Sequence, residues 1–128
     1  MKRTGWMRKL FGDGGERVAT RYLKRQGYRI IARQSLNRVG EVDIIATDGD
    51  TLVFVEVKTR SSHVAGHPAE AVHATKQRQI ARSALMWLKR HRLLDRRCRF
   101  DVVAITWRTG EQPLIQHYRA AFEPPIDW

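Results

Sequence analysis

Residues 41–59 read EVDIIATDGDTLVFVEVKT, and this stretch decides the fold that the sequence predicts. Apolar and polar residues alternate on both sides of Asp48-Gly49, as they do in a strand whose two faces differ. Asp-Gly between two such runs is a strong signal for a two-residue hairpin turn. We therefore predict an antiparallel hairpin of 41–47 and 51–59 that turns at Asp48-Gly49.

The predicted turn also fixes which side chains share a face of the hairpin. Glu41 pairs with Glu56 and Asp43 pairs with Phe54, and directly paired residues point to the same side of a sheet. One face then carries a polar set, and the other carries a core-forming set. The polar set is Glu41, Asp43, Glu56 and Lys58, and the core-forming set is Val42, Ile44, Val53, Val55 and Val57. A three-residue turn would place the valines beside the acids, which argues against that turn.

The polar face of the hairpin suggests a metal site. Carboxylates that face each other repel and raise each other's pKa unless a cation lies among them. Mg²⁺ and Mn²⁺ prefer such oxygen ligands. Asp43 and Glu56 are therefore candidate metal ligands, and Lys58 is placed to assist an attacking water or to balance charge on a phosphate. A surface ion-pair network on an exposed sheet face is the structural alternative.

Further elements follow from periodicity and from glycine and proline signals. They are a helix over about 16–26, a strand over 28–32, a polar loop over 34–40, a helix from Pro68 to about 90, a strand over 100–107 and an edge strand over 114–122. This order predicts an α/β fold with a mixed central sheet flanked by helices.

Two charged residues fall on the apolar faces of the predicted helices. Glu16 is in line with Leu23, and Lys76 lies between Val72 and Ile80. A buried charge is costly unless it is paired, so both side chains could reach the acidic pocket. The alternatives are an acid favoured by the helix dipole and a lysine whose stem covers apolar surface.

Other polar residues are interpreted as structural. We expect Glu41 to pair with Arg38 or Arg60 rather than to bind metal, and Asp101 to pair with an arginine. Cys98 is the sole cysteine, so an intrachain disulfide is excluded.

Length and composition bound the class of protein. The chain has 128 residues and is 42% hydrophobic and 29% charged, as globular domains are. We predict one domain over 13–122, a basic flexible segment over 1–12 and a tail over 123–128. The sequence shows no run typical of a signal peptide and no stretch of 18 apolar residues, so we expect a cytoplasmic protein with no membrane contact.

The charge of the chain is strongly unbalanced. Lys and Arg number 24 against 13 Asp and Glu, a formal net charge of +11. Such a charge attracts polyanions, and we expect nucleic acid, DNA before RNA, as the partner. The predicted phosphate contacts are Arg60, Lys76, Arg78, Lys89, Arg90 and Arg92. A solvated basic face is the alternative.

Several short motifs occur in order along the chain. They are Gly15-Glu16, Gly40-Glu41-Val42-Asp43, Val55-Glu56-Val57-Lys58-Thr59-Arg60, Ala71-Val72 followed by Lys76, and Arg99-Phe100-Asp101-Val102-Val103. Asp43 with Glu56-Val57-Lys58 resembles the Asp…Glu-x-Lys pattern of PD-(D/E)XK nucleases. The whole set, over about 12–122, resembles the YraN-like family of bacterial proteins, and the chain departs from that family's pattern in 34–38.

The resemblance implies a restriction-endonuclease-like fold with an αβββαβ core. It further implies that Asp43, Glu56 and the backbone carbonyl of Val57 bind Mg²⁺ or Mn²⁺, that Lys58 is catalytic, and that Glu16 assists. Many nucleases of this fold dimerise, so a homodimer is an expectation by analogy.

Three hypotheses about function follow. The first is a metal-dependent endonuclease that hydrolyses phosphodiester bonds in DNA, on branched or single-stranded intermediates. The second is a nucleic-acid-binding module of the same fold without turnover. The third is a basic RNA- or ribosome-associated protein in which the acidic residues are structural.

Overall fold

The structure, a computed structural model, describes residues 5–61 and 72–123, with side chains described for 14–61 and 72–123. Within these ranges two helices and five strands follow one another, as α1 (Gly5–Arg25), β1 (Arg29–Leu36), β2 (Glu41–Asp48), β3 (Thr51–Ser61), α2 (Ala74–Arg90), β4 (Cys98–Trp107) and β5 (Leu114–Phe122). This order confirms the predicted α/β fold with an αβββαβ core, to which β5 adds an edge strand.

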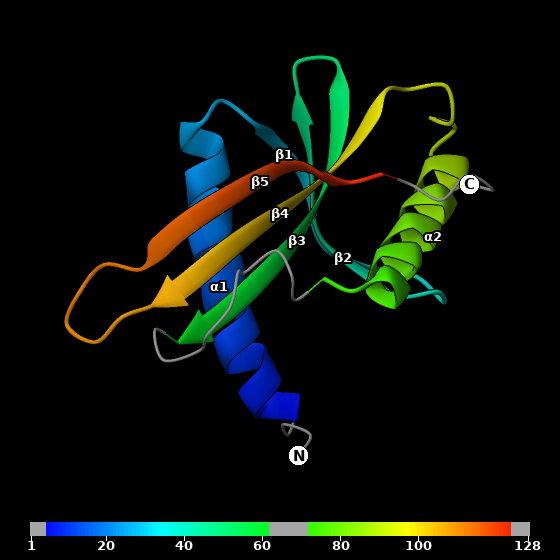
Figure 1. The fold of residues 1–128 in the computed structure, drawn as a ribbon. Coiled ribbons are helices and arrows are strands. Elements are labelled where there is room, and N and C mark those ends of the chain that lie inside the picture. Colours follow the sequence, from blue (N-terminus) through cyan, green and yellow to red (C-terminus); the bar gives the residue numbers. More distant parts are fainter. Residues whose placement is uncertain (1–4, 62–71, 124–128) are drawn as a thin grey trace.

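The five strands form one mixed sheet in sequence order, β1-β2-β3-β4-β5. Neighbouring strands are antiparallel except β3 and β4, which are parallel. Parallel strands need a crossover connection, and here α2 lies within it. Figure 1 shows α1 and α2 on opposite sides of the sheet.

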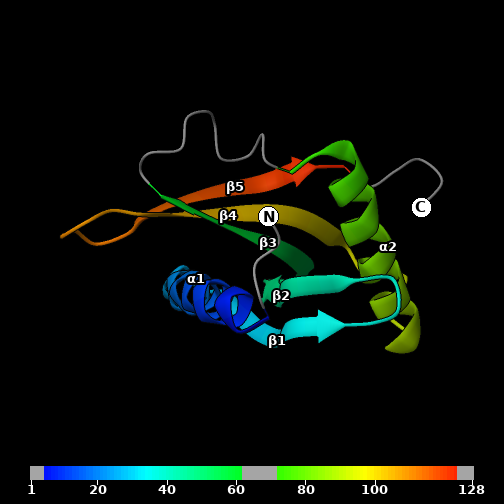
Figure 2. The same ribbon diagram turned by 90° about the horizontal axis from the view of Figure 1, so that it is seen from below.

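Each face of the sheet has its own apolar core. Ala19 and Leu23 of α1 pack with Ile44, Val53 and Val55, while α2 packs on the other face. The second core includes Val42, Ile45, Phe54, Ile80, Ala84, Trp87, Leu88 and Phe100. Strands that are covered on both faces need apolar residues on both. The view in Figure 2, from below, shows the two helices against different parts of the twisted sheet.

This two-sided burial corrects the predicted faces of the hairpin. The prediction placed Val42 and Ile44 in one core, but Val42 packs on the α2 side and Ile44 on the α1 side. The polar face is not an open surface either, because Phe54 and Glu56 are both buried. The predicted alternation holds in β3, where Val53 and Val55 share the α1 side, but it fails between Val42 and Ile44, and the face that was expected to be exposed is covered.

The turn of the hairpin lies one residue later than predicted. Asp48 pairs with Thr51, so Gly49 and Asp50 form the turn. Gly49 has φ +60°, which suits glycine at the first central position of a hairpin turn. Ile44 consequently pairs with Val55, and the predicted partnerships of Glu41 with Glu56 and of Asp43 with Phe54 are wrong.

Helix α1 begins at Gly5 rather than near Glu16, and it runs through the two glycines that were expected to precede it. A Cβ at Gly15 would collide with Cγ2 of Thr59, whereas a Cβ at Gly14 would meet its nearest described neighbour at 3.9 Å. Glycine at position 15 therefore lets α1 approach β3 closely.

Other boundaries also moved. Strand β1 continues to Leu36 through part of the predicted loop, and α2 begins at Ala74. Pro68, the predicted start of that helix, lies outside the described residues, as do 124–128 of the predicted tail. Among the described residues, no helix is long and apolar enough to cross a membrane.

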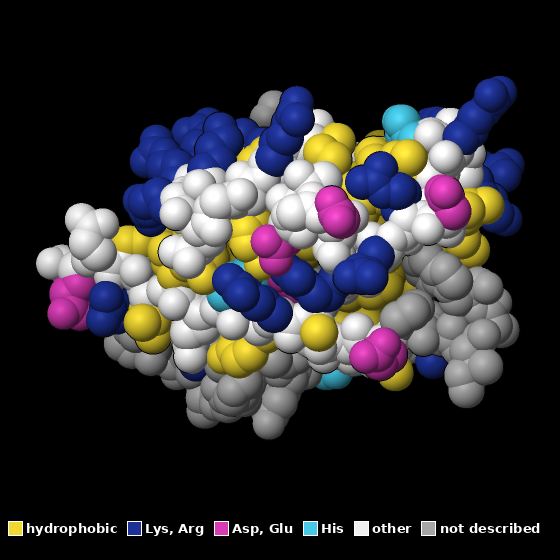
Figure 3. All heavy atoms as spheres, turned by 90° about the horizontal axis from the view of Figure 1, so that it is seen from above, with side chains coloured by type: hydrophobic (Ala, Val, Ile, Leu, Met, Phe, Trp, Pro, Cys, Tyr) yellow, Lys and Arg dark blue, Asp and Glu magenta, His cyan; other side chains and the backbone are white. Residues whose placement is uncertain are grey.

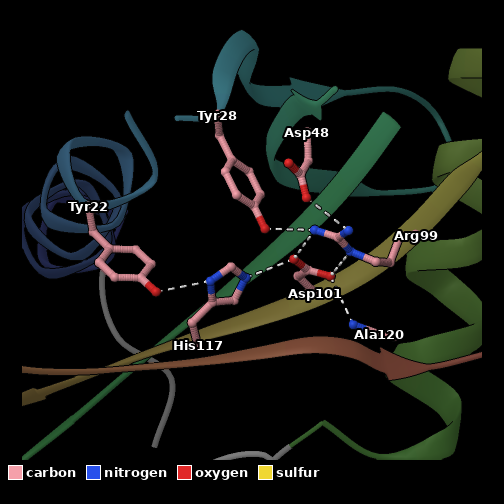
Figure 4. Close-up of polar contacts among 7 residues, drawn as sticks. All are labelled: Tyr22, Tyr28, Asp48, Arg99, Asp101, His117 and Ala120. Atoms are coloured by element: carbon pink, nitrogen blue, oxygen red, sulfur yellow. Dashed lines mark hydrogen bonds and ion pairs between the residues drawn. The ribbon is translucent and has the colours of Figure 1, made fainter. Parts of the chain in front are cut away.

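A buried carboxylate, Asp101, joins β4 to β5 (Figure 4). Arg99 donates to it through Nε at 2.9 Å and Nη2 at 3.1 Å, His117 Nε2 lies 2.7 Å away, and the Ala120 N–H donates at 3.0 Å. Burial alone would raise the pKa of Asp101, but these hydrogen bonds outweigh it and hold that pKa below its usual range. The prediction that Asp101 pairs with an arginine is confirmed.

The same network extends to α1 and β2. His117 Nδ1 lies 3.1 Å from the Tyr22 hydroxyl, and Arg99 donates to the Tyr28 hydroxyl at 2.7 Å and to Asp48 at 3.1 Å. Because ionised Asp101 can only accept hydrogen bonds, His117 carries a proton on Nε2. The network thus connects four elements around one buried charge.

Candidate metal centre

The acidic residues meet where β2 separates from β3. The pairing of these strands ends at Ile44 and Val55, and the same register brings Asp43 opposite Glu56. There the Asp43 carboxylate replaces a main-chain acceptor, because its Oδ2 accepts the N–H of Val57 at 2.8 Å. The hairpin therefore presents a carboxylate at the position where its ladder stops.

Half-buried Asp43 and buried Glu56 form a carboxyl pair. Burial and the charge of Asp43 outweigh the opposing charges of Lys76 and Lys58 and raise the pKa of Glu56 to about 8. Burial also raises the pKa of Asp43. The hydrogen bonds that Asp43 receives from Val57 and Glu56, and the charges of Lys76 and Lys58, oppose this rise but do not cancel it. Both carboxyls therefore resist ionisation unless positive charge is supplied.

Lys76 approaches this pair from α2. Its Nζ lies 3.8 Å from Glu56 Oε1, and its side chain is 40% exposed. This confirms that Lys76 reaches the acidic pocket from the apolar stripe of its helix. Its ammonium compensates part of the charge on Glu56.

A second carboxylate group overlaps the first at Asp43. Ligand oxygens of Glu16, Glu41 and Asp43 all lie within 4.8 Å of one another. Burial, together with the charges of Asp43 and Glu41, raises the pKa of Glu16 to about 7. Asp43 thus belongs both to this group and to the pair with Glu56.

Glu16 is held by an unusual residue of β1. Gln34 hydrogen bonds to the Glu16 carboxyl and, together with the charge of Arg33, lowers its pKa. Gln34 has φ +50°, a region that residues other than glycine rarely adopt. The backbone of β1 is therefore distorted at the residue whose side chain orients Glu16.

The donor set fits a hard divalent cation. Oxygens that bind one ion at about 2.1–2.4 Å can be no more than about 4.8 Å apart, which Glu16, Glu41 and Asp43 satisfy. Glu16 is 93% buried, and its Oε2 has no hydrogen-bond partner among the described residues. A buried carboxylate oxygen without a donor is costly, and a bound cation would remove that cost. These residues could hold a metal ion.

The remaining predicted site residues lie close by. The N–H and C=O of a strand residue point to the same neighbouring strand, so the Val57 carbonyl faces β2, as the predicted ligation requires. Lys58 is half-buried on β3, and its charge lowers the pKa of Asp43 and of Glu56.

The predicted phosphate contacts are spread more widely. Arg60 follows Lys58 on β3 and Lys76 touches the acidic pair, while Arg78 is exposed near the start of α2. Lys89, Arg90 and Arg92 are exposed at the other end of α2, roughly 20 Å along the helix from Lys76 at 1.5 Å per residue. The structure does not bring those three residues to the acidic group.

Two contributors were missed or undervalued in the sequence. Glu41 was interpreted as a structural partner, although its strand position already placed it on the same face as Asp43. Gln34 was assigned to a loop, and no local signal predicts that a glutamine adopts a positive φ or contacts a helix eighteen residues earlier.

Fold and site together define an α/β protein with an αβββαβ core and a carboxylate cluster that could bind a metal ion. The model of the uncharacterised protein family UPF0102 matches residues 15–105. The chain is 50% identical to a UPF0102 protein of Geobacter metallireducens, over 90% of this chain and 93% of the relative. It is 52% identical to a UPF0102 protein of Rhodococcus opacus, over 87% of this chain and 94% of the relative.

The chain belongs to the UPF0102 family, which confirms the resemblance to YraN-like proteins.

Proposed function

We propose that the protein is a Mg²⁺- or Mn²⁺-dependent endonuclease that hydrolyses phosphodiester bonds in DNA. The observation that carries the proposal is the carboxyl pair of Asp43 and buried Glu56, flanked by Lys58 and Lys76 and joined through Asp43 to Glu16. Carboxylates that share a metal with a lysine beside them suit the hydrolysis of an anionic diester.

Different residues of the site would have different roles in the hydrolysis. Asp43 is oriented by the Val57 N–H and would hold the ion with Glu56, while Glu16, whose oxygens lie within 4.8 Å of those of Asp43, would assist. The ion, when bound, would polarise the phosphate and lower the pKa of a bound water. Lys58 would donate to a phosphate oxygen and stabilise the charge that develops there, while Lys76 stays paired with Glu56. Burial of the carboxylates excludes competing water from their inner side.

The test measures metal binding and cleavage on the same samples. Calorimetry with Mg²⁺ and Mn²⁺ at pH 7 compares the wild type with Asp43→Asn/Glu56→Gln and with a control, Asp50→Asn/Glu111→Gln, that removes the same charge from exposed positions. Cleavage is assayed on single-stranded, duplex and branched DNA. We expect wild type and control to bind metal and cleave, and the site variant to do neither.

Calorimetry also reports the release of protons when the metal binds. With pKa values of about 7 and about 8, Glu16 is partly protonated and Glu56 is mostly protonated at pH 7 without the ion, so metal binding should release protons. The measured heat should therefore depend on the ionisation enthalpy of the buffer. A folded wild type that binds no divalent ion, even with DNA present, would rule out the proposed function.

A binding module without turnover is the second candidate. The ion pair of Lys76 with Glu56 favours it, because a lysine at 3.8 Å supplies part of the compensating charge without a metal. Metal-independent DNA binding with no cleavage on the whole panel would favour this candidate.

A further inference from the structure

The outward face of α1 carries a row of basic side chains. Arg17, Arg21, Lys24 and Arg25 are exposed, and we call them the α1 basic ridge. The inward face of the same helix carries buried Glu16, Ala19 and Leu23. One helix thus presents an acid to the candidate metal centre and bases to solvent.

The ridge is continuous and begins beside the candidate metal centre. At 3.6 residues per turn its four side chains span roughly 100° of the helix surface, and at 1.5 Å per residue they extend over about 12 Å. Its first member, Arg17, follows Glu16 directly. Arg33 of β1 is also exposed, and it is near enough to Glu16 to lower that residue's pKa.

The ridge is electrostatically unsatisfied within the part of the chain that the structure describes. Arg17 and Arg21, like Arg21 and Arg25, are four residues apart, a spacing at which like charges destabilise a helix. Residues 14–25 hold one acidic side chain, Glu16, and it faces inward. No ion pair within 4.0 Å joins the ridge to any described acidic residue.

Helix stability explains only part of this arrangement. Lys24 and Arg25 are in the last turn, where positive charge favours the helix dipole, but Arg17 and Arg21 are not. Figure 3 shows Lys and Arg side chains gathered over the end of the molecule where α1 finishes, apart from those at the end of α2. An external polyanion would satisfy the whole row.

We propose that the α1 basic ridge binds the sugar–phosphate backbone of the DNA strand that extends away from the candidate metal centre. The direction of the strand rests on the proposed function, whereas binding by the ridge does not. Basic residues one helical turn apart offer a charge every 5.4 Å or so, which suits a chain of phosphates rather than a single anion. The α1 basic ridge therefore recognises the charge of an extended row of phosphates and not the base sequence of the DNA.

The first experiment measures binding of duplex DNA without divalent metal over a range of salt concentrations. The ridge variant is Arg21→Gln/Lys24→Gln, which leaves the residue next to Glu16 unchanged. The control is Arg96→Gln/Arg108→Gln, which lowers the net charge by the same amount elsewhere. Each lost phosphate contact makes the negative slope of log K against log salt shallower by about 0.9. The slope of the ridge variant should therefore be shallower than that of the wild type by nearly 2, and the variant should bind DNA at least about tenfold more weakly near 0.1 M salt. The control should keep the wild-type slope.

The second experiment separates this proposal from the proposed function. With Mg²⁺ present, the ridge variant should cleave long DNA less well than wild type at sub-saturating concentration. It should hydrolyse bis(p-nitrophenyl) phosphate, which cannot reach the ridge, at the wild-type rate. If the wild type cleaves nothing but the ridge variant still loses salt slope, the proposed function fails and the ridge proposal stands.

Two outcomes would overturn the ridge proposal. One is a salt slope in the ridge variant that equals that of the wild type or of the control. The other is intact DNA binding combined with lost binding to phosphatidylglycerol vesicles, which would assign the ridge to an anionic membrane surface.

Discussion

The acidic cluster makes folding stability depend on pH in a direction opposite to that of ordinary salt-bridged carboxylates. Glu16 has a pKa of about 7 in the folded protein against 4.5 ordinarily, because burial disfavours its charged form. The folded state therefore holds a proton that the unfolded state has lost between these two values. Stability is highest below pH 4.5 for this group and falls as pH rises through 7.

The size of the effect follows from that pKa. At 1.36 kcal/mol per pKa unit, Glu16 alone costs the metal-free protein about 2 kcal/mol between pH 5 and pH 8. Glu56, with a pKa of about 8, acts in the same direction. In a domain of this size a loss of about 2 kcal/mol lowers Tm by roughly 8 °C. A bound cation ionises both carboxyls at little cost, so saturating Mg²⁺ should restore most of the loss.

The assay is thermal unfolding in EDTA and in Mg²⁺ at pH 5, 6, 7 and 8, with wild type, Glu16→Gln and Glu111→Gln. Glu111 is exposed and serves as the control for removal of one charge. Glu16→Gln should be the more stable protein at pH 8 in EDTA, by about 2 kcal/mol, and equal to wild type near pH 5. If wild type and Glu16→Gln show the same dependence on pH, the cluster is not buried as described and the reasoning fails.

Three further predictions concern packing and charge. Gly15→Ala should destabilise the protein by about 1–2 kcal/mol in urea unfolding, because overpacking against β3 outweighs the gain in helix propensity, whereas Gly14→Ala should be neutral or stabilising. Asp101→Asn should cost roughly 3 kcal/mol, because it leaves buried donors without their charged acceptor; a loss below about 1 kcal/mol would contradict the network. Lys76→Met should raise the pKa of Glu56, measured by carbon NMR titration of its carboxyl, and an unchanged pKa would show that the ion pair is absent in solution.

The sequence predicted the elements that depend on local pattern. The alternation of 51–59 and the β-branched run of 100–107 each became a strand, because side-chain period and backbone geometry are tied to each other. The candidate acids Asp43 and Glu56 also came from this periodicity. The observed turn begins and ends one residue later than predicted, and a shift of both turn positions by one residue leaves Asp43 and Glu56 on the same face.

What the sequence could not predict depends on contacts between distant residues. The turn lies one residue later than predicted because Gly49 adopts a positive φ at the first central position of the turn. Both Asp48-Gly49 and Gly49-Asp50 are acceptable turn sequences, so the sequence alone does not distinguish them. Coverage of the acidic face followed from where α2 packs, which no hairpin pattern contains. The contact of Gln34 with Glu16 and that of His117 with Asp101 likewise arise only when separate strands and helices come together.

The position of Asp101 has a consequence for the order in which the chain is synthesised. Its carboxylate is fully buried in β4, yet His117 and the N–H of Ala120 emerge from the ribosome only sixteen and nineteen residues later. Until β5 has been made, the nascent sheet would have to bury a charge with half of its donors missing. Stable packing around β4 therefore has to wait for β5, and compaction of the chain becomes favourable only once nearly the whole sheet has been synthesised.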